Sequence, residues 1–110
     1  MTLPPDATIW RVNRTAGLLP RGCTKRFQIG ADGRPNAGLT SFIGIPIGRF
    51  DVVYRSDGNE ELWYRRWPVV DVLHRREGSG PNGTRIGTGN VRVPRGRRVR
   101  FCRFELVAID

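Results

Sequence analysis

A single histidine and a large excess of arginine are the residues of this chain whose chemistry stands out. His74 follows a run of mostly apolar residues, with Asp71 three positions before it and Glu77 three positions after it. A histidine held by a carboxylate can act as a general base, and arginines could bind a scissile phosphate beside it. This pattern would suit a small ribonuclease or toxin centred on His74. Because no serine, cysteine or second histidine stands beside it, we expect that the protein is not an enzyme, and the nuclease is a third hypothesis.

Arginine supplies almost all of the positive charge. The chain has 19 Lys and Arg residues against 10 Asp and Glu residues, for a formal net charge of +9, and Lys25 is the single lysine. Residues 85–103 contain no acid. Binding of such a stretch to phosphates would weaken steeply with salt. We predict that nucleic acid or an acidic partner contacts its seven arginines, which are Arg85, Arg92, Arg95, Arg97, Arg98, Arg100 and Arg103.

Two tryptophans flank another arginine. Trp63 and Trp67 are four positions apart, so both would lie on one face of a straight strand, with Arg65 between them. Core packing is the default for such rings. The alternative is a subunit interface, where Trp and Arg are enriched, and we take Trp63, Arg65 and Trp67 as its candidates. A cation–π contact between Arg65 and either ring would fit both alternatives.

Metal and cofactor sites are not expected. The chain has two cysteines, Cys23 and Cys102, and with His74 they cannot supply a four-ligand zinc site. Residues 78–83 match the spacing GxGxxG, but a proline lies within them and no helical pattern follows, so we predict a loop there. We expect both cysteines to be reduced, with at least one of them in the core.

The composition predicts an all-β fold. The 110 residues support one domain, 1–110, and are too few for a Rossmann or TIM-barrel enzyme. Fourteen glycines and eight prolines fall mostly in groups about ten residues apart, and the short apolar runs between these groups alternate with period two. We therefore predict a small antiparallel β-sandwich or barrel with long glycine-rich loops and little helix.

The expected strands follow from these runs. The clearest element is a hairpin over residues 49–66, in which Asp57 and Gly58 form a two-residue turn that pairs Arg55 with Glu60 and Val53 with Leu62. In the last strand, alternation places Cys102, Phe104 and Leu106 on one face. Further strands are expected over residues 8–13, 25–29, 39–47 as an edge or bulged strand, and 69–74. Residues 77–90 are expected to form a long loop, or a loop with a short strand at 84–86, and two strands should follow around 94–97.

The expected role and location of the protein follow from its net charge, its glycine-rich loops and its N-terminal sequence. The N-terminus lacks the basic and apolar regions of an export signal, and no apolar run approaches a membrane span, so we expect a soluble protein of cytoplasmic origin without a membrane partner. Partners would order such glycine-rich loops. We expect a structural or assembly subunit of a larger particle, such as a cement, connector or tail component of a bacteriophage or virus. The alternative is a free nucleic-acid-binding β-barrel.

Overall fold

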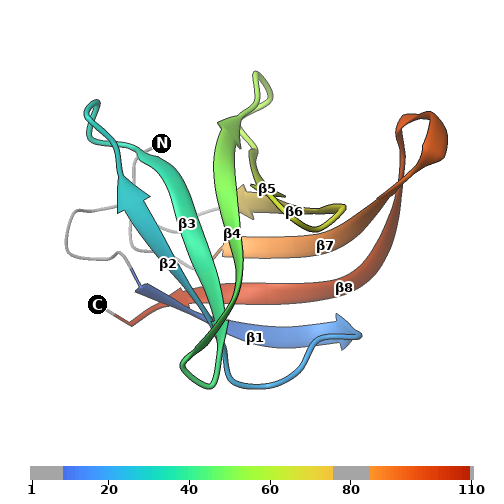
Figure 1. Ribbon diagram of the computed structural model, residues 1–110, viewed down its shortest axis with the longest axis horizontal. Coiled ribbons are helices and arrows are strands. Elements are labelled where there is room, and N and C mark those ends of the chain that lie inside the picture. The colour runs from blue at the N-terminus through green and yellow to red at the C-terminus, as the bar shows by residue number, and fades with distance from the viewer. Residues whose placement is uncertain (1–8, 76–84, 110) are drawn as a thin grey trace.

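The computed structural model describes residues 9–75 and 85–109, which fold almost entirely as strands (Figure 1). Among these residues there is no helix long and apolar enough to span a lipid bilayer. The elements are β1 (Ile9–Gly17), β2 (Cys23–Ile29), β3 (Pro35–Phe42), β4 (Ile45–Tyr54), β5 (Glu60–Tyr64), β6 (Val69–Arg75), β7 (Arg85–Val93), the 3-10 turn η1 (Pro94–Gly96) and β8 (Arg97–Ala108).

The sheet closes on itself. Each strand pairs antiparallel with the next one along the chain, and β8 returns to pair with β1 from Trp10 opposite Ala108 to Gly17 opposite Cys102. The fold is therefore a closed eight-stranded up-and-down barrel, which confirms the predicted all-β class and selects the barrel over the sandwich. Closure gives each of the eight described strands a neighbour on both sides.

Because consecutive strands run in opposite directions, the connections between them alternate between the two ends of the barrel. The chain reverses at every strand, so the β1–β2, β3–β4, β5–β6 and β7–β8 connections share one end, which we call the open end. The β2–β3 and β4–β5 connections lie at the other end, which we call the far end (Figure 1). The β7–β8 hairpin extends well beyond the rest of the barrel (Figure 1).

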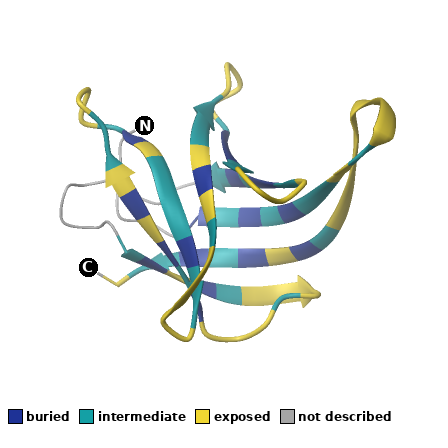
Figure 2. Cartoon of the chain, in the orientation of Figure 1, coloured by how far each residue is buried: buried dark blue, intermediate teal, exposed yellow. Residues whose placement is uncertain are grey.

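Every second side chain of a strand points into the barrel, and Figure 2 shows the resulting bands of buried residues. The core is rich in aromatic rings, with Phe27 and Phe50 in edge-to-face contact at 5.5 Å between centroids. Cys102, Phe104 and Leu106 are all buried, which confirms the predicted face of the last strand. Both cysteines are free and buried, also as predicted. The core cluster consists of Trp10, Val12, Cys23, Phe27, Phe50, Leu62, Leu73, Cys102, Phe104 and Leu106.

Several predicted boundaries were wrong. Residues 39–47 are not one strand, because the chain reverses at Ile43 and Gly44, both with positive φ. Residues 85–90 belong to the long strand β7 and not to a loop. Their glycines are needed inside the barrel, since a side-chain carbon on Gly87 would overlap the ring of Phe104. The remainder of that expected loop, with the GxGxxG spacing, falls in residues 76–84, outside the described residues.

The predicted hairpin exists, but its register is shifted by one residue. Val52 pairs with Leu62 and Val53 with Glu61. The reason is the turn, in which the Arg55 amide donates to the Asn59 carbonyl (2.9 Å) and the Gly58 amide donates to the Arg55 carbonyl (3.1 Å). The loop therefore has three residues and ends on Gly58 at φ +88°. This register turns Leu62 into the barrel and Glu61 outward.

Gly58→Val should lower the free energy of unfolding by about 1–3 kcal/mol, because a β-branched residue is strained at this positive φ. Gly58→Asn should lose clearly less, since asparagine tolerates the left-handed region. Urea unfolding of the two variants and the wild type measures the difference. Identical midpoints for Gly58→Val and wild type would contradict the turn.

Candidate ligand-binding cavity

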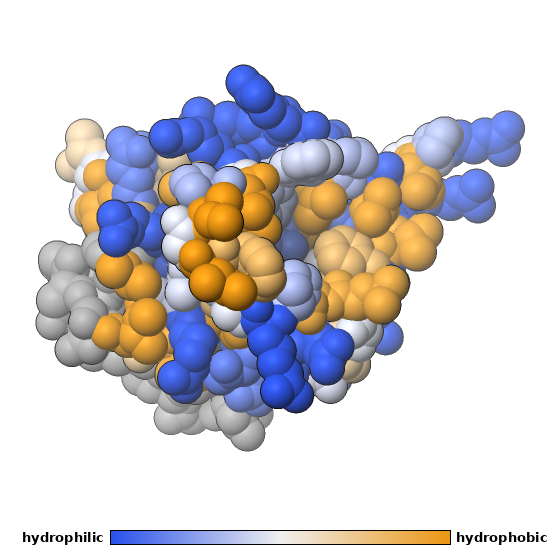
Figure 3. Space-filling model, turned by 60° about the horizontal axis from the view of Figure 1, so that its bottom comes forward, coloured by the Kyte–Doolittle hydropathy of each residue, from blue (hydrophilic) through white to orange (hydrophobic). Residues whose placement is uncertain are grey.

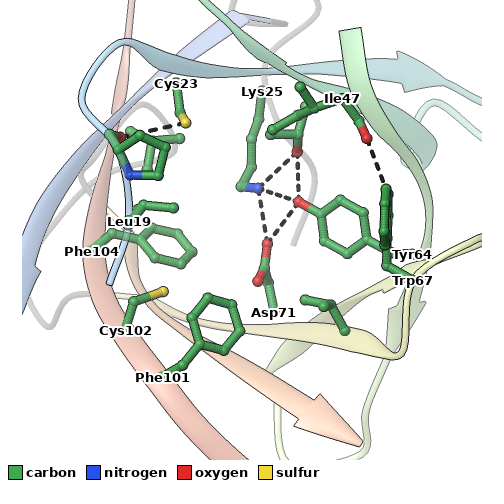
Figure 4. A pocket seen from close by; sticks show the side chains of 14 residues that line it. Leu19, Cys23, Lys25, Ile47, Tyr64, Trp67, Asp71, Phe101, Cys102 and Phe104 are labelled. Atoms are coloured by element: carbon green, nitrogen blue, oxygen red, sulfur yellow. Dashed lines mark hydrogen bonds and ion pairs between the residues drawn. The ribbon is translucent and has the colours of Figure 1, made fainter. Parts of the chain in front are cut away.

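A cavity of about 260 Å³ lies inside the barrel toward the open end (Figure 4). Its walls come from strands on all sides of the barrel and from two of the open-end connections. Most of the lining is apolar, and the exceptions are concentrated in one cluster of polar side chains. The apolar lining residues are Val12, Leu19, Pro20, Ile47, Trp67, Val69, Phe101 and Phe104, together with Cys23 and Cys102.

The polar cluster joins four side chains from four strands. Lys25 Nζ lies 2.9 Å from Asp71 Oδ2 in an ion pair, donates to Thr40 Oγ1 (2.9 Å) and donates to the Tyr64 hydroxyl (2.6 Å). The Tyr64 hydroxyl donates to Asp71 Oδ2 (3.0 Å) and lies 2.6 Å from Thr40 Oγ1. Figure 4 shows these bonds converging on the Lys25 ammonium. The cluster is thus a closed network built around a buried ion pair.

Strand pairing explains how these side chains meet. On β2, alternation turns Cys23, Lys25 and Phe27 inward, and Lys25 is the direct cross-strand partner of Thr40 on β3. Asp71 comes from β6, on the opposite wall of the barrel. Tyr64 reaches the cluster past Gly48, where an added side-chain carbon would lie 2.9 Å from the tyrosine ring.

The electrostatics keep the cluster in one protonation state. Burial of Lys25 acts to lower the pKa of its ammonium, but Asp71 and Tyr64 outweigh burial and raise that pKa above its ordinary value. Burial raises the pKa of Tyr64 to about 12; Asp71 adds to the increase, and Lys25 and Thr40 oppose it. At neutral pH Lys25 is therefore an ammonium and Tyr64 a neutral hydroxyl. The Lys25 ammonium also lies 5.3–5.6 Å from the ring centroids of Phe50, Tyr64 and Phe104.

A β-bulge in β8 shapes the wall opposite the polar cluster. Cys102 pairs with Gly89, but the next residue of β7, Asn90, pairs with Arg100, so Phe101 is the extra residue. The irregularity allows both Phe101 and Cys102 to line the cavity, where strict alternation would place only one of them. Gly89 leaves the space they need, since an added side-chain carbon there would lie 2.6 Å from Cys102 Sγ.

The open end carries a rim of exposed apolar side chains. Leu18 is 80% exposed and Ile43 is 71% exposed, and both belong to connections at this end. Figure 3 turns this end toward the viewer and shows apolar surface gathered on it. The indole of Trp67 donates to the Ile47 carbonyl (3.1 Å), which joins the β5–β6 connection to β4. We call this set the rim, and it comprises Leu18, Ile43, Ile45, Ile47, Trp67 and Val99.

The predicted arginine surface is divided by the structure. Arg85 is buried and lies inside the barrel near the Trp10 ring, so it was wrongly assigned to an exposed contact surface. Arg92 and Arg98 pack against the Trp63 ring, at 4.9 and 5.5 Å from its centroid. All six arginines of the stretch other than Arg85 are exposed, and Arg95, Arg97, Arg100 and Arg103 are the four that do not pack against Trp63.

The predicted pairing of two tryptophans on one strand face was wrong. β5 ends at Tyr64, so Trp63 lies on its outer face, whereas Trp67 lies in the β5–β6 connection at the rim. Arg65 forms an exposed ion pair with Asp51 (2.8 Å), and the cation–π contacts of Trp63 come from β7 and β8 instead. The strand is too short to carry both rings on one face.

A second group of charges surrounds Trp63 on the outer face. Glu61 accepts hydrogen bonds from Arg98 (3.0 Å), Arg55 (2.7 Å) and the Trp63 indole (2.9 Å). Burial acts to raise the pKa of Glu61, but these three hydrogen bonds outweigh it and lower the pKa to about 2. Arg55 thus bonds Glu61. The predicted register had paired Arg55 with Glu60 instead. This group holds the β7–β8 hairpin against β5.

The residues proposed for a nuclease do not come together as predicted. His74 Nδ1 lies 2.9 Å from the Asn59 side-chain oxygen, on the outside of the barrel. Asp71 points inward to Lys25, because residues three apart on a strand face opposite sides. Glu77 lies outside the described residues. Within residues 9–75 and 85–109, no cluster of three or more His, Cys, Asp or Glu side chains could hold a metal ion.

Lys25, Thr40 and Tyr64 were missed as site residues in the sequence, and Asp71 was considered only as a partner of His74. Two signals were present. Lys25 is the single lysine of an arginine-rich chain and stands between Cys23 and Phe27, at a position that alternation turns inward. Asp71 interrupts an otherwise apolar strand. A buried acid and a buried base in two such strands indicate that each is the partner of the other.

Comparison of the chain with protein-family models, with curated proteins and with solved structures found no match. Function is therefore inferred from the chemistry of the described residues.

Lys25→Met should lower the free energy of unfolding by about 3–5 kcal/mol, because it leaves the buried Asp71 carboxylate without its countercharge. Lys25→Met combined with Asp71→Leu should recover most of this loss, since both charges are then removed together. Arg26→Met, at an exposed neighbouring position of β2, is the matched control and should change little. Chemical denaturation measures all three. A Lys25→Met variant as stable as Arg26→Met would show that the ion pair does not form.

Proposed function

We propose that this barrel binds a small, largely apolar molecule in the cavity at its open end. The observation that carries the proposal is the cavity itself, in which the polar side chains are gathered in one cluster and aromatic and aliphatic groups form the rest of the lining. A closed eight-stranded barrel has an interior that can either be filled by side chains or hold one small ligand. Here the side chains of the far end fill it, and those of the open end do not.

The size of the cavity bounds the ligand. An interior apolar cavity of about 150 Å³ is enough to bind benzene. The cavity described here, at about 260 Å³, therefore suits a molecule of roughly two fused rings, and it lies below the usual size of drug-binding pockets, about 300–1,000 Å³. The rim supports this proposal, because exposed apolar groups around a cavity mouth are typical of a ligand-binding groove.

The protonation states of Lys25 and Tyr64 fit a binding site and not a catalytic one. The Lys25 ammonium is held in its protonated form by Asp71, so it lacks the free electron pair that a nucleophilic lysine needs. Tyr64 keeps its proton at neutral pH. A group whose pKa lies far from the working pH is a poor general acid or base. We therefore propose a binding protein and not an enzyme.

A second candidate function, the assembly subunit, is supported by the same rim. Leu18, Ile43 and Ile45 are more exposed than an isolated domain usually leaves large apolar side chains in one place. Partner subunits seated on the rim would bury them. The exposed arginines Arg95, Arg97, Arg100 and Arg103 would then face acidic partners or nucleic acid, as the sequence predicts.

Leu19→Trp should abolish ligand binding, because the larger ring enters the cavity from its mouth. Leu18→Trp is the matched control and should bind as wild type does, since Leu18 points to solvent. Chemical shifts of cavity methyl groups in NMR spectra, recorded while 2-naphthol or 2-methoxynaphthalene is added, report binding. If neither probe shifts any cavity methyl group in the folded wild type, the proposed function is wrong.

Sedimentation at about 50 mM and about 500 mM salt, with and without mixed-sequence nucleic acid, tests the second candidate. An assembly subunit should form a discrete oligomer at both salt concentrations, and Ile43→Ser combined with Ile45→Ser should reduce it to a monomer. A wild-type monomer under all conditions contradicts assembly of this chain alone. A complex with nucleic acid that is present only at low salt, and is lost when Arg97 and Arg100 are replaced by alanine, would favour the nucleic-acid-binding alternative.

A further inference from the structure

We infer that the cavity selects an uncharged ligand that donates a hydrogen bond, through a hydroxyl or N–H group on an apolar body, and that the acceptor is Asp71 Oδ1. This inference rests on the proposed function and names the ligand class that the site would take. It follows from the donors and acceptors of the polar cluster, from their charges and from the surroundings of Asp71.

The hydrogen-bond donors of the cluster are fully used within it. An ammonium group has three N–H donors, and the threonine and tyrosine hydroxyls have one donor each, which makes five. Five contacts join the members, namely Lys25 to Thr40, Tyr64 and Asp71, Tyr64 to Asp71, and Thr40 to Tyr64. With Thr40 donating to Tyr64, each donor has one acceptor. The cluster therefore offers the cavity acceptors and no donor.

Asp71 Oδ1 is the strongest of the remaining acceptors. The contacts of Asp71 with the other described members of the cluster all engage Oδ2. Figure 4 shows the carboxylate with Oδ2 toward Lys25 and Tyr64 and its other oxygen toward the space bounded by Phe101, Phe104 and Cys102. Asp71 is buried and lines the cavity. A ligand donor that reaches Oδ1 inside this apolar cavity would form a charge-assisted hydrogen bond, which is stronger than a bond between neutral groups.

A ligand with a charged group would bind poorly beside Asp71 and Lys25. A ligand carboxylate would meet the carboxylate of Asp71 and find no free N–H group on Lys25. A ligand ammonium at Oδ1 would lie close to the Lys25 ammonium, which already neutralises Asp71. Transfer of either ion into an apolar cavity is unfavourable without a countercharge. A neutral donor avoids both costs.

The test is a series of four ligands that share one naphthalene body and differ in one group. They are 2-naphthol, 2-methoxynaphthalene, 2-naphthoate and 2-(aminomethyl)naphthalene, which at pH 7 are a neutral donor, a neutral acceptor, an anion and a cation. Calorimetric titration of the wild-type protein gives each dissociation constant. We expect 2-naphthol to bind at least about tenfold more tightly than 2-methoxynaphthalene, and the two ions to bind more weakly than both.

The variant Lys25→Met/Asp71→Leu removes the acceptor and its countercharge together, and leaves Thr40 and Tyr64 as partners of each other. It should still bind 2-methoxynaphthalene, with the preference for 2-naphthol reduced to about threefold or less. A variant that keeps the full preference would overturn the assignment of Asp71. The wild-type series decides the ligand class even if this variant does not fold.

The outcomes separate the inference from the proposed function. Equal affinity for 2-naphthol and 2-methoxynaphthalene would overturn the inference and leave an apolar binding cavity in place. Tighter binding of 2-naphthoate would overturn it as well, because it would show that Lys25 donates to the ligand. If none of the four ligands binds to the folded wild-type protein, the proposed function and the inference are both wrong.

Discussion

The buried ion pair between Lys25 and Asp71 is the interaction on which the interior of this barrel depends. The two side chains come from β2 and β6, which lie on opposite walls, so their contact crosses the barrel. Two buried charges are tolerated only when they are paired and their other hydrogen-bonding groups are satisfied. Thr40 and Tyr64, from two further strands, accept the remaining hydrogen bonds of Lys25, and Tyr64 also donates to Asp71 Oδ2. These bonds fix the relative positions of four strands at one level of the barrel.

The balance between glycine and aromatic residues determines which part of the barrel is filled. Gly87 faces the ring of Phe104, and Gly48 faces the ring of Tyr64, so strands without side chains at these points admit large rings from their neighbours. Toward the open end the bulge brings both Phe101 and Cys102 to the wall, and the described residues leave a cavity there. The same sheet thus has a packed core at one end and a cavity at the other, with the polar cluster between them.

The sequence predicted the class of fold well and the site poorly, for a physical reason. Period-two alternation is local, so it located most strands and the buried face of Cys102, Phe104 and Leu106. Register and closure depend on contacts between distant residues, and one extra residue in the turn at Gly58 was enough to shift a hairpin. Arg85, Lys25 and Asp71 are charged residues at inward positions. The sequence-based prediction put Arg85 on a contact surface, gave Lys25 no role and considered Asp71 only beside His74. Their partners lie on strands that are distant in the sequence and come together only in the closed barrel.

The most direct test of this account is the position of a bound ligand, measured as intermolecular nuclear Overhauser effects between 2-naphthol and the isotope-labelled protein. The account predicts effects to the Thr40 methyl group, to Leu19 and to the Phe104 ring, which surround the space beside Asp71. Effects confined to the outer face, at Trp63 and Arg92, would place the ligand outside the barrel and contradict the central claim.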